Sequence, residues 1–106
     1  MNLNSAEASE LAEAVVAQVG TQMEVAVCLC PTFTSLEAVS QKVVDSNIAL
    51  GAQNMHHENS GAYTGEISAE MLRHLFVSFV IIGHSERREY FGESDATVNK
   101  KTLAAL

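Results

Sequence analysis

FVIIGHSERREYFGESD, residues 79–95, is the stretch that decides the fold and places its chemistry. Residues 79–82 are apolar at consecutive positions, a pattern that predicts a strand buried on both faces. His84, Ser85 and Glu86 follow at the carboxyl end of that strand, where α/β proteins with parallel sheets place their reactive groups. The stretch therefore predicts a functional site, or the remnant of one, at a strand end.

Strands and helices alternate along the rest of the chain. Strands are expected at residues 24–30, 48–53 and 79–83, and helices at residues 4–20, 34–44, 68–75 and 94–106. Asn4 and Glu7 have the spacing of a capping box. Thr34 and Glu37 have the same spacing. Alternating elements predict βαβ units, so we expect an α/β fold with about three parallel strands and four helices.

The expected elements do not close into a complete fold. Three short strands are few, the first helix has no strand before it, and nothing in the sequence protects the two edges of the sheet. No linker composition divides residues 1–106, so we expect one domain. That domain is expected to be incomplete, or to be completed by another copy of the chain.

The composition excludes several classes of protein. Of the 106 residues, 47% are hydrophobic, with one proline and no tryptophan, which is typical of a globular chain. The formal net charge of −7 argues against nucleic acid and anionic membranes as partners. No stretch is long and apolar enough to span a bilayer, and residues 1–10 lack the features of a signal peptide. We therefore expect a cytoplasmic chain.

Neither of two groups of potential metal ligands is arranged in the sequence as a metal site would require. Cys28 and Cys30 share one face of an expected strand, and their spacing matches neither a zinc nor a redox motif. We expect them to be small buried hydrophobic residues in a reducing compartment. His56, His57 and Glu58 lie in a loop, where adjacent histidines rarely converge on one ion. The glycines match neither the dinucleotide fingerprint nor the P-loop.

Among the residues after the third strand, His84 is the strongest catalytic candidate. A histidine titrates near neutral pH and can give or take a proton. Glu86 is equally compatible with a carboxylate of the site and with a structural role. For Arg87 and Arg88 we favour structural ion pairs that tie strand ends to loops. Their expected acidic partners are Glu93, Asp95 and Glu66.

Three stretches of the sequence resemble the triosephosphate isomerase family. They are MNLNSAE (residues 1–7), GAQNMHHENSGAYTGEIS (residues 51–68) and GHSERREYFGESD (residues 83–95). The match extends in order and register across nearly the whole chain. The resemblance implies an eightfold (βα) barrel. Residues 1–106 would hold a truncated part of it, from the loop after the first strand to the fourth helix.

The resemblance also implies roles for residues at two strand ends. As is established for this family, His84 would be a neutral electrophile that polarises the substrate carbonyl, with Ser85 and Glu86 as its neighbours. The loop at residues 55–66 would insert into a partner subunit, where Thr64 would reach the partner's active site. The residues assigned to this subunit-interface loop are Gln53, Asn54, Tyr63, Thr64, Gly65 and Glu66. The family works as a dimer without a metal or an organic cofactor.

Other parts of the family's site have no match within the chain. The substrate-binding asparagine and lysine would precede Met1, and the catalytic glutamate would follow Leu106. We therefore expect the chain alone to be inactive and to form a homo-oligomer through open strand edges or inner faces. Two alternatives stay open. A complementing fragment could restore the glycolytic interconversion of dihydroxyacetone phosphate and glyceraldehyde 3-phosphate, or the chain could be a non-catalytic module that binds a triose phosphate or a partner through the loop around Thr64.

Overall fold

A computed structural model describes residues 1–106 and contains three strands and five α-helices. The strands are β1 (Val27–Leu29), β2 (Ile48–Ala52) and β3 (Phe79–Val80). The helices are α1 (Ser5–Val19), α2 (Leu36–Val43), α3 (Ala69–His74), α4 (Ser85–Tyr90) and α5 (Asp95–Ala105), with a short 3-10 helix η1 (Phe33–Ser35) before α2. The strands are parallel in the order β1-β2-β3, with Val27 opposite Ile48 and Gly51 opposite Phe79. The expected α/β fold with three parallel strands is confirmed.

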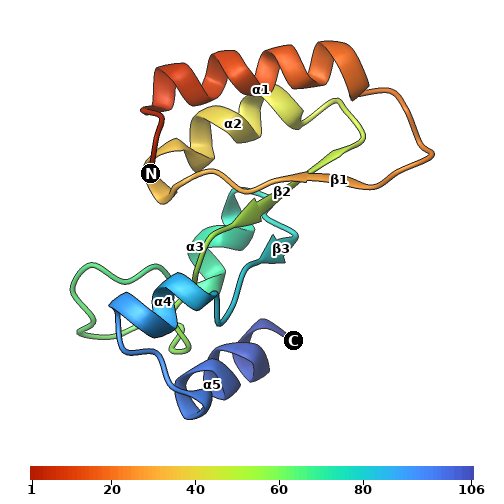
Figure 1. Ribbon diagram of the computed structural model, residues 1–106. Coiled ribbons are helices and arrows are strands. Elements are labelled where there is room, and N and C mark those ends of the chain that lie inside the picture. Colours follow the sequence, from red (N-terminus) through yellow and green to blue (C-terminus); the bar gives the residue numbers. More distant parts are fainter.

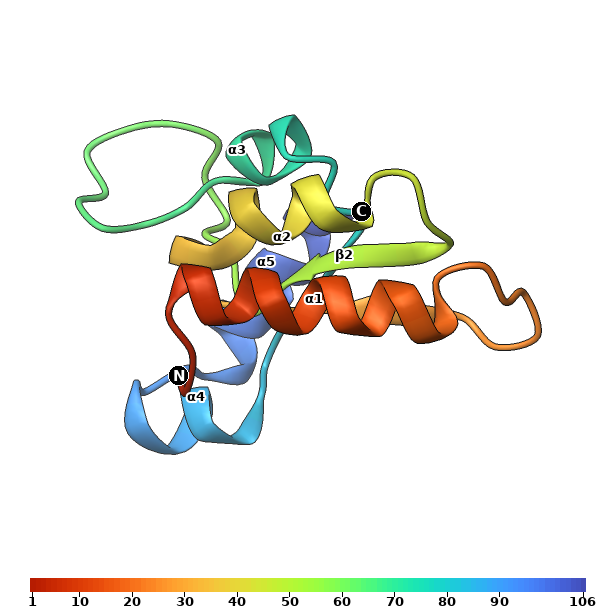
Figure 2. The same ribbon diagram turned by 90° about the horizontal axis from the view of Figure 1, so that it is seen from above.

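The apolar core lies between the sheet and the first two helices. Figures 1 and 2 both show α1 and α2 lying side by side near β2, whereas Figure 1 shows α4 and α5 at the opposite end of the molecule. Ile48, Leu50 and Ala52 are buried, and because side chains alternate along a strand they share the helix-covered face of β2. The other buried apolar residues are Ala8, Ala12, Leu36, Val39, Val43, Met55 and Leu72.

Local capping explains where three of the helices begin. Asn4 and Glu7 form the expected capping box at the start of α1, with reciprocal hydrogen bonds of 2.9 and 3.0 Å. Ser68 and Ser94 are the N-caps of α3 and α5, and each side chain accepts a backbone N–H. The expected capping box at Thr34 is wrong, because Thr34 lies inside η1 and α2 begins without a side-chain cap.

The expectation of a strand buried on both faces at residues 79–82 is also wrong. Only Phe79 and Val80 pair with β2, and Phe79 keeps 59% of its surface exposed. Ile81 is exposed as well, although its N–H still donates to the Ala52 carbonyl at 2.9 Å. The reason is that helices cover only one face of this sheet, so the side chains that alternate onto the other face meet no part of the chain.

The expected number of four helices is too low because the charged run after the third strand is itself helical. Residues 85–90 form α4, and His84 occupies its N-cap position. The helix buries none of its residues, so it lacks the apolar stripe by which helices are found in a sequence. No helix of the structure has the length and apolar character needed to cross a membrane.

The two cysteines are not the buried residues that their small size and apolar character predicted. Cys28 is exposed and Cys30 is half-buried, and neither forms a disulfide. In β1 the side chains of Val27 and Leu29 alternate with that of Cys28, and their partners Ile48 and Leu50 are on the helix-covered face of β2. The cysteines therefore lie on the uncovered face.

Candidate functional site at the end of β3

Gly83 turns the chain from β3 toward α4. Its φ of +69° lies in the left-handed region, and a Cβ added there would come within 3.0 Å of the Val98 side chain and 3.3 Å of the Arg88 guanidinium. The Gly83 carbonyl accepts a hydrogen bond of 3.0 Å from Nε of Arg88. Only glycine fits this turn without strain, and the turn places His84 at the carboxyl end of the strand, as the sequence predicts.

The side chain of His84 is held by the helix that it caps. Its Nδ1 accepts the backbone N–H of Glu86 at 3.1 Å. A ring nitrogen that accepts an N–H carries no proton of its own, so this contact favours the neutral ring with its proton on Nε2. The side chain is 47% exposed, so a molecule from outside can reach the ring.

Ser85 and Glu86 follow His84 but make no close side-chain contact with it. Ser85 is the first residue of α4 and is exposed. One carboxylate oxygen of Glu86 lies 3.7 Å from Nδ1 of His84, and the Glu86 side chain is 73% exposed. The carboxylate is therefore solvated and held by no partner at hydrogen-bond distance.

A polar cluster joins the buried Asn54, Glu93 and Lys101 to the half-buried Arg87. The Lys101 ammonium donates to the Asn54 side-chain oxygen at 2.8 Å and forms an ion pair with Glu93. Glu93 also lies 3.2 Å from Nε of Arg87. The Lys101 and Glu93 side chains are only 6% and 5% exposed. The cluster thereby joins the end of β2 to α4 and α5.

The cluster explains the ionisation of Glu93. Burial alone would raise the pKa of its carboxyl group, but contacts with Lys101 and then Arg87, together with their positive charges, hold the pKa below the ordinary value. The carboxylate is therefore charged at neutral pH, and its charge is balanced inside the protein.

The sequence patterns do not single out Lys101 as a site residue, and they do not predict that Asn54 is buried. A lysine in a solvent-exposed helix is ordinarily a surface residue. The available signal was helical spacing, because Lys101 lies three positions after the half-buried Val98 and so shares its face of α5. The contact with Asn54 spans 47 residues of sequence, which no local pattern reports.

The second arginine of the run has a more exposed partner. Arg88 Nη1 lies 2.8 Å from Asp95, whose side chain is 96% exposed. Arg87 also places its guanidinium 4.9 Å from the centre of the Phe91 ring. Both arginines are thus paired within residues 83–95 and not with Glu66.

The loop between β2 and α3 carries the residues that the resemblance assigns to a subunit contact. Tyr63 is 44% exposed, and Thr64, Gly65 and Glu66 are exposed too. His56 packs against Tyr63 with ring centres 4.4 Å apart. At the start of the loop, Asn54 is buried against Lys101, and the Gln53 side chain donates to the Cys30 carbonyl at 2.8 Å. The side chains of Gln53 and Asn54 therefore form hydrogen bonds within this chain.

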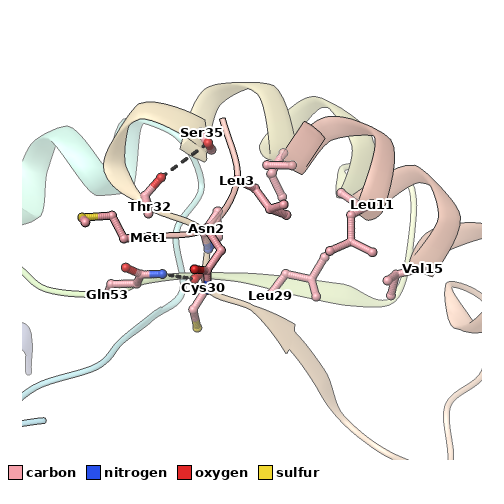
Figure 3. A pocket seen from close by; sticks show the side chains of 14 residues that line it. Met1, Asn2, Leu3, Leu11, Val15, Leu29, Cys30, Thr32, Ser35 and Gln53 are labelled. Carbon is pink, nitrogen blue, oxygen red and sulfur yellow. Dashed lines mark hydrogen bonds between the residues drawn. The ribbon is translucent and has the colours of Figure 1, made fainter. Parts of the chain in front are cut away.

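No group of three or more His, Cys, Asp or Glu side chains is arranged to hold a metal ion. A cavity of about 280 Å³ lies elsewhere, between α1 and the end of β1 (Figure 3). Leu11, Val15 and Leu29 line it, and it shares no residue with the His84 region. The exposed ring of His84 lies outside this cavity.

The family model for triosephosphate isomerase matches residues 1–106. The triosephosphate isomerase of Alkaliphilus oremlandii is 54% identical over 107 residues, which cover 100% of this chain and 42% of the relative. That of Clostridium botulinum strain Loch Maree is 62% identical over 80 residues, or 76% of this chain and 32% of the relative. The crystal structure of the Bartonella henselae triosephosphate isomerase superposes with a TM-score of 0.88 at 38% identity, covering 99% of this chain and 43% of that one.

These comparisons agree with the parallel three-stranded sheet. They also show how much of the family's fold the chain contains, because the chain spans about two-fifths of the length of the Alkaliphilus and Bartonella proteins. The fold is accordingly part of a (βα) barrel. The chain belongs to the triosephosphate isomerase family.

Proposed function

We propose that this chain supplies the electrophilic histidine of a triosephosphate isomerase site, and that residues 1–106 do not catalyse isomerisation alone. The observation that carries the proposal is the hydrogen bond from the Glu86 backbone N–H to Nδ1 of His84. It favours a neutral ring whose Nε2–H can donate to a substrate oxygen. The family membership supplies the reaction, the interconversion of dihydroxyacetone phosphate and glyceraldehyde 3-phosphate.

The reaction moves one proton between neighbouring carbons through an enediol. When a base removes the proton from the carbon beside the carbonyl, negative charge develops on the carbonyl oxygen. The Nε2–H of His84 would donate a hydrogen bond to that oxygen and then pass protons between the two oxygens of the enediol. A neutral imidazole suits this role because it can both donate and accept a proton at Nε2.

Residues 1–106 offer no replacement for the base. Glu86 is the carboxylate nearest to His84, but it is 73% exposed and no contact fixes it beside a bound substrate. General base catalysis contributes on the order of 10²–10⁴ to a rate, and only when the base is positioned. The chain also lacks matches to the family's substrate-binding lysine and mobile lid. We therefore expect its activity alone to equal that of buffer.

The test is an isomerase assay on the purified chain, alone and with the complementing segments of the Alkaliphilus oremlandii enzyme that lie before and after the matched region. Activity is expected only in the mixture. His84→Gln should abolish it, whereas His74→Gln, a change at an exposed histidine of α3, should leave it intact. Activity of the chain alone that His84→Gln removes would contradict the inactive half of the proposal. Activity of the mixture that survives His84→Gln would contradict the histidine's role.

We also propose that the chain self-associates. Exposed apolar side chains on and beside the uncovered face include those of Phe79 and Ile81, and β1 and β3 each have an unpaired edge. Burial of apolar surface contributes roughly 25 cal/mol per Å², and strand edges pair readily. Light scattering after size exclusion should give a mass above that of one chain, and a compact monomer at micromolar concentration would refute the association. The glycolytic role favours a cytoplasmic location.

A further inference from the structure

The thiols of Cys28 and Cys30 form a close pair on the uncovered face of the sheet. Their sulfurs are 3.8 Å apart. The two side chains lie on the same face because positions 28 and 30 are two residues apart in an extended segment. Figure 3 shows the sulfur of Cys30 pointing away from the cavity beside α1. No helix covers the pair, and Cys28 is exposed.

Gly51 on the neighbouring strand makes room for both sulfurs. A Cβ at this position would lie 2.5 Å from the sulfur of Cys30 and 3.0 Å from that of Cys28. Any side chain there would therefore push the thiols away from each other or off the sheet. The carbonyl of Cys30 is fixed in turn by the side chain of Gln53, which donates to it at 2.8 Å. The pair is thus held by its neighbours in the sheet.

The separation of the sulfurs distinguishes two kinds of dithiol chemistry. A disulfide needs them about 2.05 Å apart, and two residues of extended strand place their Cα atoms about 6.6 Å apart, near the upper limit for such a bond. By contrast, one atom bonded to both sulfurs at about 2.3 Å, the Zn–S distance, with a near-tetrahedral angle places them about 3.8 Å apart. A pyramidal trivalent centre has a narrower angle and needs the sulfurs somewhat closer. The observed 3.8 Å is a contact between two unbonded thiols, and only a small shift separates it from the span of either bridging atom.

The ionisation of the thiols favours one kind of bridging centre over another. Loss of hydration, followed by the charge of the Cys30 thiolate and its hydrogen bond, raises the pKa of Cys28 to about 11. A divalent metal ion needs two thiolates and would have to displace this proton at neutral pH. A centre that reacts with neutral thiols and releases their protons in water meets no such obstacle.

We propose that Cys28 and Cys30 form a dithiol site that binds one trivalent arsenical across both sulfurs. With phenylarsine oxide as the probe, both S–H bonds break and two As–S bonds form. The oxygen of the arsenical leaves with the two protons as one water molecule. Arsenic stays in its trivalent state and neither sulfur is oxidised, so the step needs no oxidant. The site does not depend on His84 and is independent of the proposed isomerase role.

The test is a titration of the reduced chain with phenylarsine oxide, followed by intact-mass spectrometry under a large excess of a monothiol. One arsenical per chain should persist, and a competing small dithiol should remove it. Cys28→Ser and Cys30→Ser each leave one thiol, and their affinity should fall by on the order of 10²-fold or more, because the second bond is no longer intramolecular. Ser40→Cys, on α2, is a matched control that adds a third thiol and should leave the tight stoichiometry at one.

A second variant separates the spacing of the thiols from their mere presence. Gly51→Ala keeps both cysteines but places a methyl group where the two sulfurs converge, so it should weaken the adduct while circular dichroism still reports a folded chain. The proposal is overturned if the native chain forms no adduct that resists the monothiol. It is equally overturned if either single-cysteine variant holds the arsenical as tightly as the native chain, or if each arsenical joins two chains.

Discussion

The first seventy-five residues and the residues from Gly83 onward are held together by different forces. All ten buried hydrophobic residues lie between Ala8 and Leu72, where α1 and α2 pack on β2. From Gly83 onward the only buried residues are Glu93 and Lys101, both charged. Apolar packing tolerates small displacements, whereas a buried ion pair stabilises one geometry and becomes costly when one partner is lost. His84 lies at the start of this second region, and the turn that leads to it is held by Arg88, whose Nε donates to the Gly83 carbonyl.

The sharpest test of this contrast is the substitution Lys101→Met. It leaves the Glu93 carboxylate buried without its ammonium partner, a change that costs about 3–5 kcal/mol for a buried pair. The loss should be local, because no apolar core joins α5 to the first region. Hydrogen exchange should show amide protection lost in α5 and kept in α1. Combining Lys101→Met with Glu93→Leu should restore most of the protection, whereas equal loss in α1 and α5 would show that the chain unfolds as one unit.

The converse substitution is Leu36→Ala in the apolar region. The Leu36 side chain is 2% exposed between α2 and the sheet, and truncating a buried leucine costs about 2–5 kcal/mol. Here we expect amide protection to fall throughout the chain, including α5, because the residues from Gly83 onward have no apolar core of their own. Leu103→Ala is the matched control, since that leucine is 66% exposed and its change should stay within about 0.5 kcal/mol. Protection of α5 that survives Leu36→Ala would show that the residues from Gly83 onward fold independently.

Acid should act on the two regions differently. The pKa of Glu93 is lower in the folded chain than its ordinary value of 4.5, so the unfolded chain binds the proton more readily. The stabilisation from Glu93 is therefore complete above about pH 4.5 and is lost as the pH falls through the lower, folded value. Exchange measured across this range should show α5 losing protection before α1. The same series on Glu93→Gln should lack this early step, and a step of unchanged size would assign the acid sensitivity to another carboxylate.

The contrast between the regions also explains which features the sequence predicts. The capping box at Asn4 and the strand expected at residues 48–53 rest on local patterns, and the structure contains both. The exposure of Phe79 and the openness of the cysteine face depend on what covers a strand, which no short pattern records. The contact of Lys101 with Asn54 arises only when two distant segments meet. The sequence does not reveal Lys101 because its partner lies far away along the chain, and not because the residue itself is unusual.

The smallest predicted effect compares two helix caps of similar strength. Ser94→Ala removes the acceptor for the Thr97 N–H, and Asn4→Ala removes one half of the capping box of α1. Each should cost about 1 kcal/mol. The cost of Asn4→Ala should appear in the melting of the whole chain, because α1 packs on the apolar core. That of Ser94→Ala should appear only as faster exchange in α5, because α5 is joined to the core through Lys101. Equal losses of amide protection in both helices for both variants would mean that the ion cluster couples the two regions as tightly as apolar packing does. The two regions would then differ in the kind of contact that holds them together and not in cooperativity.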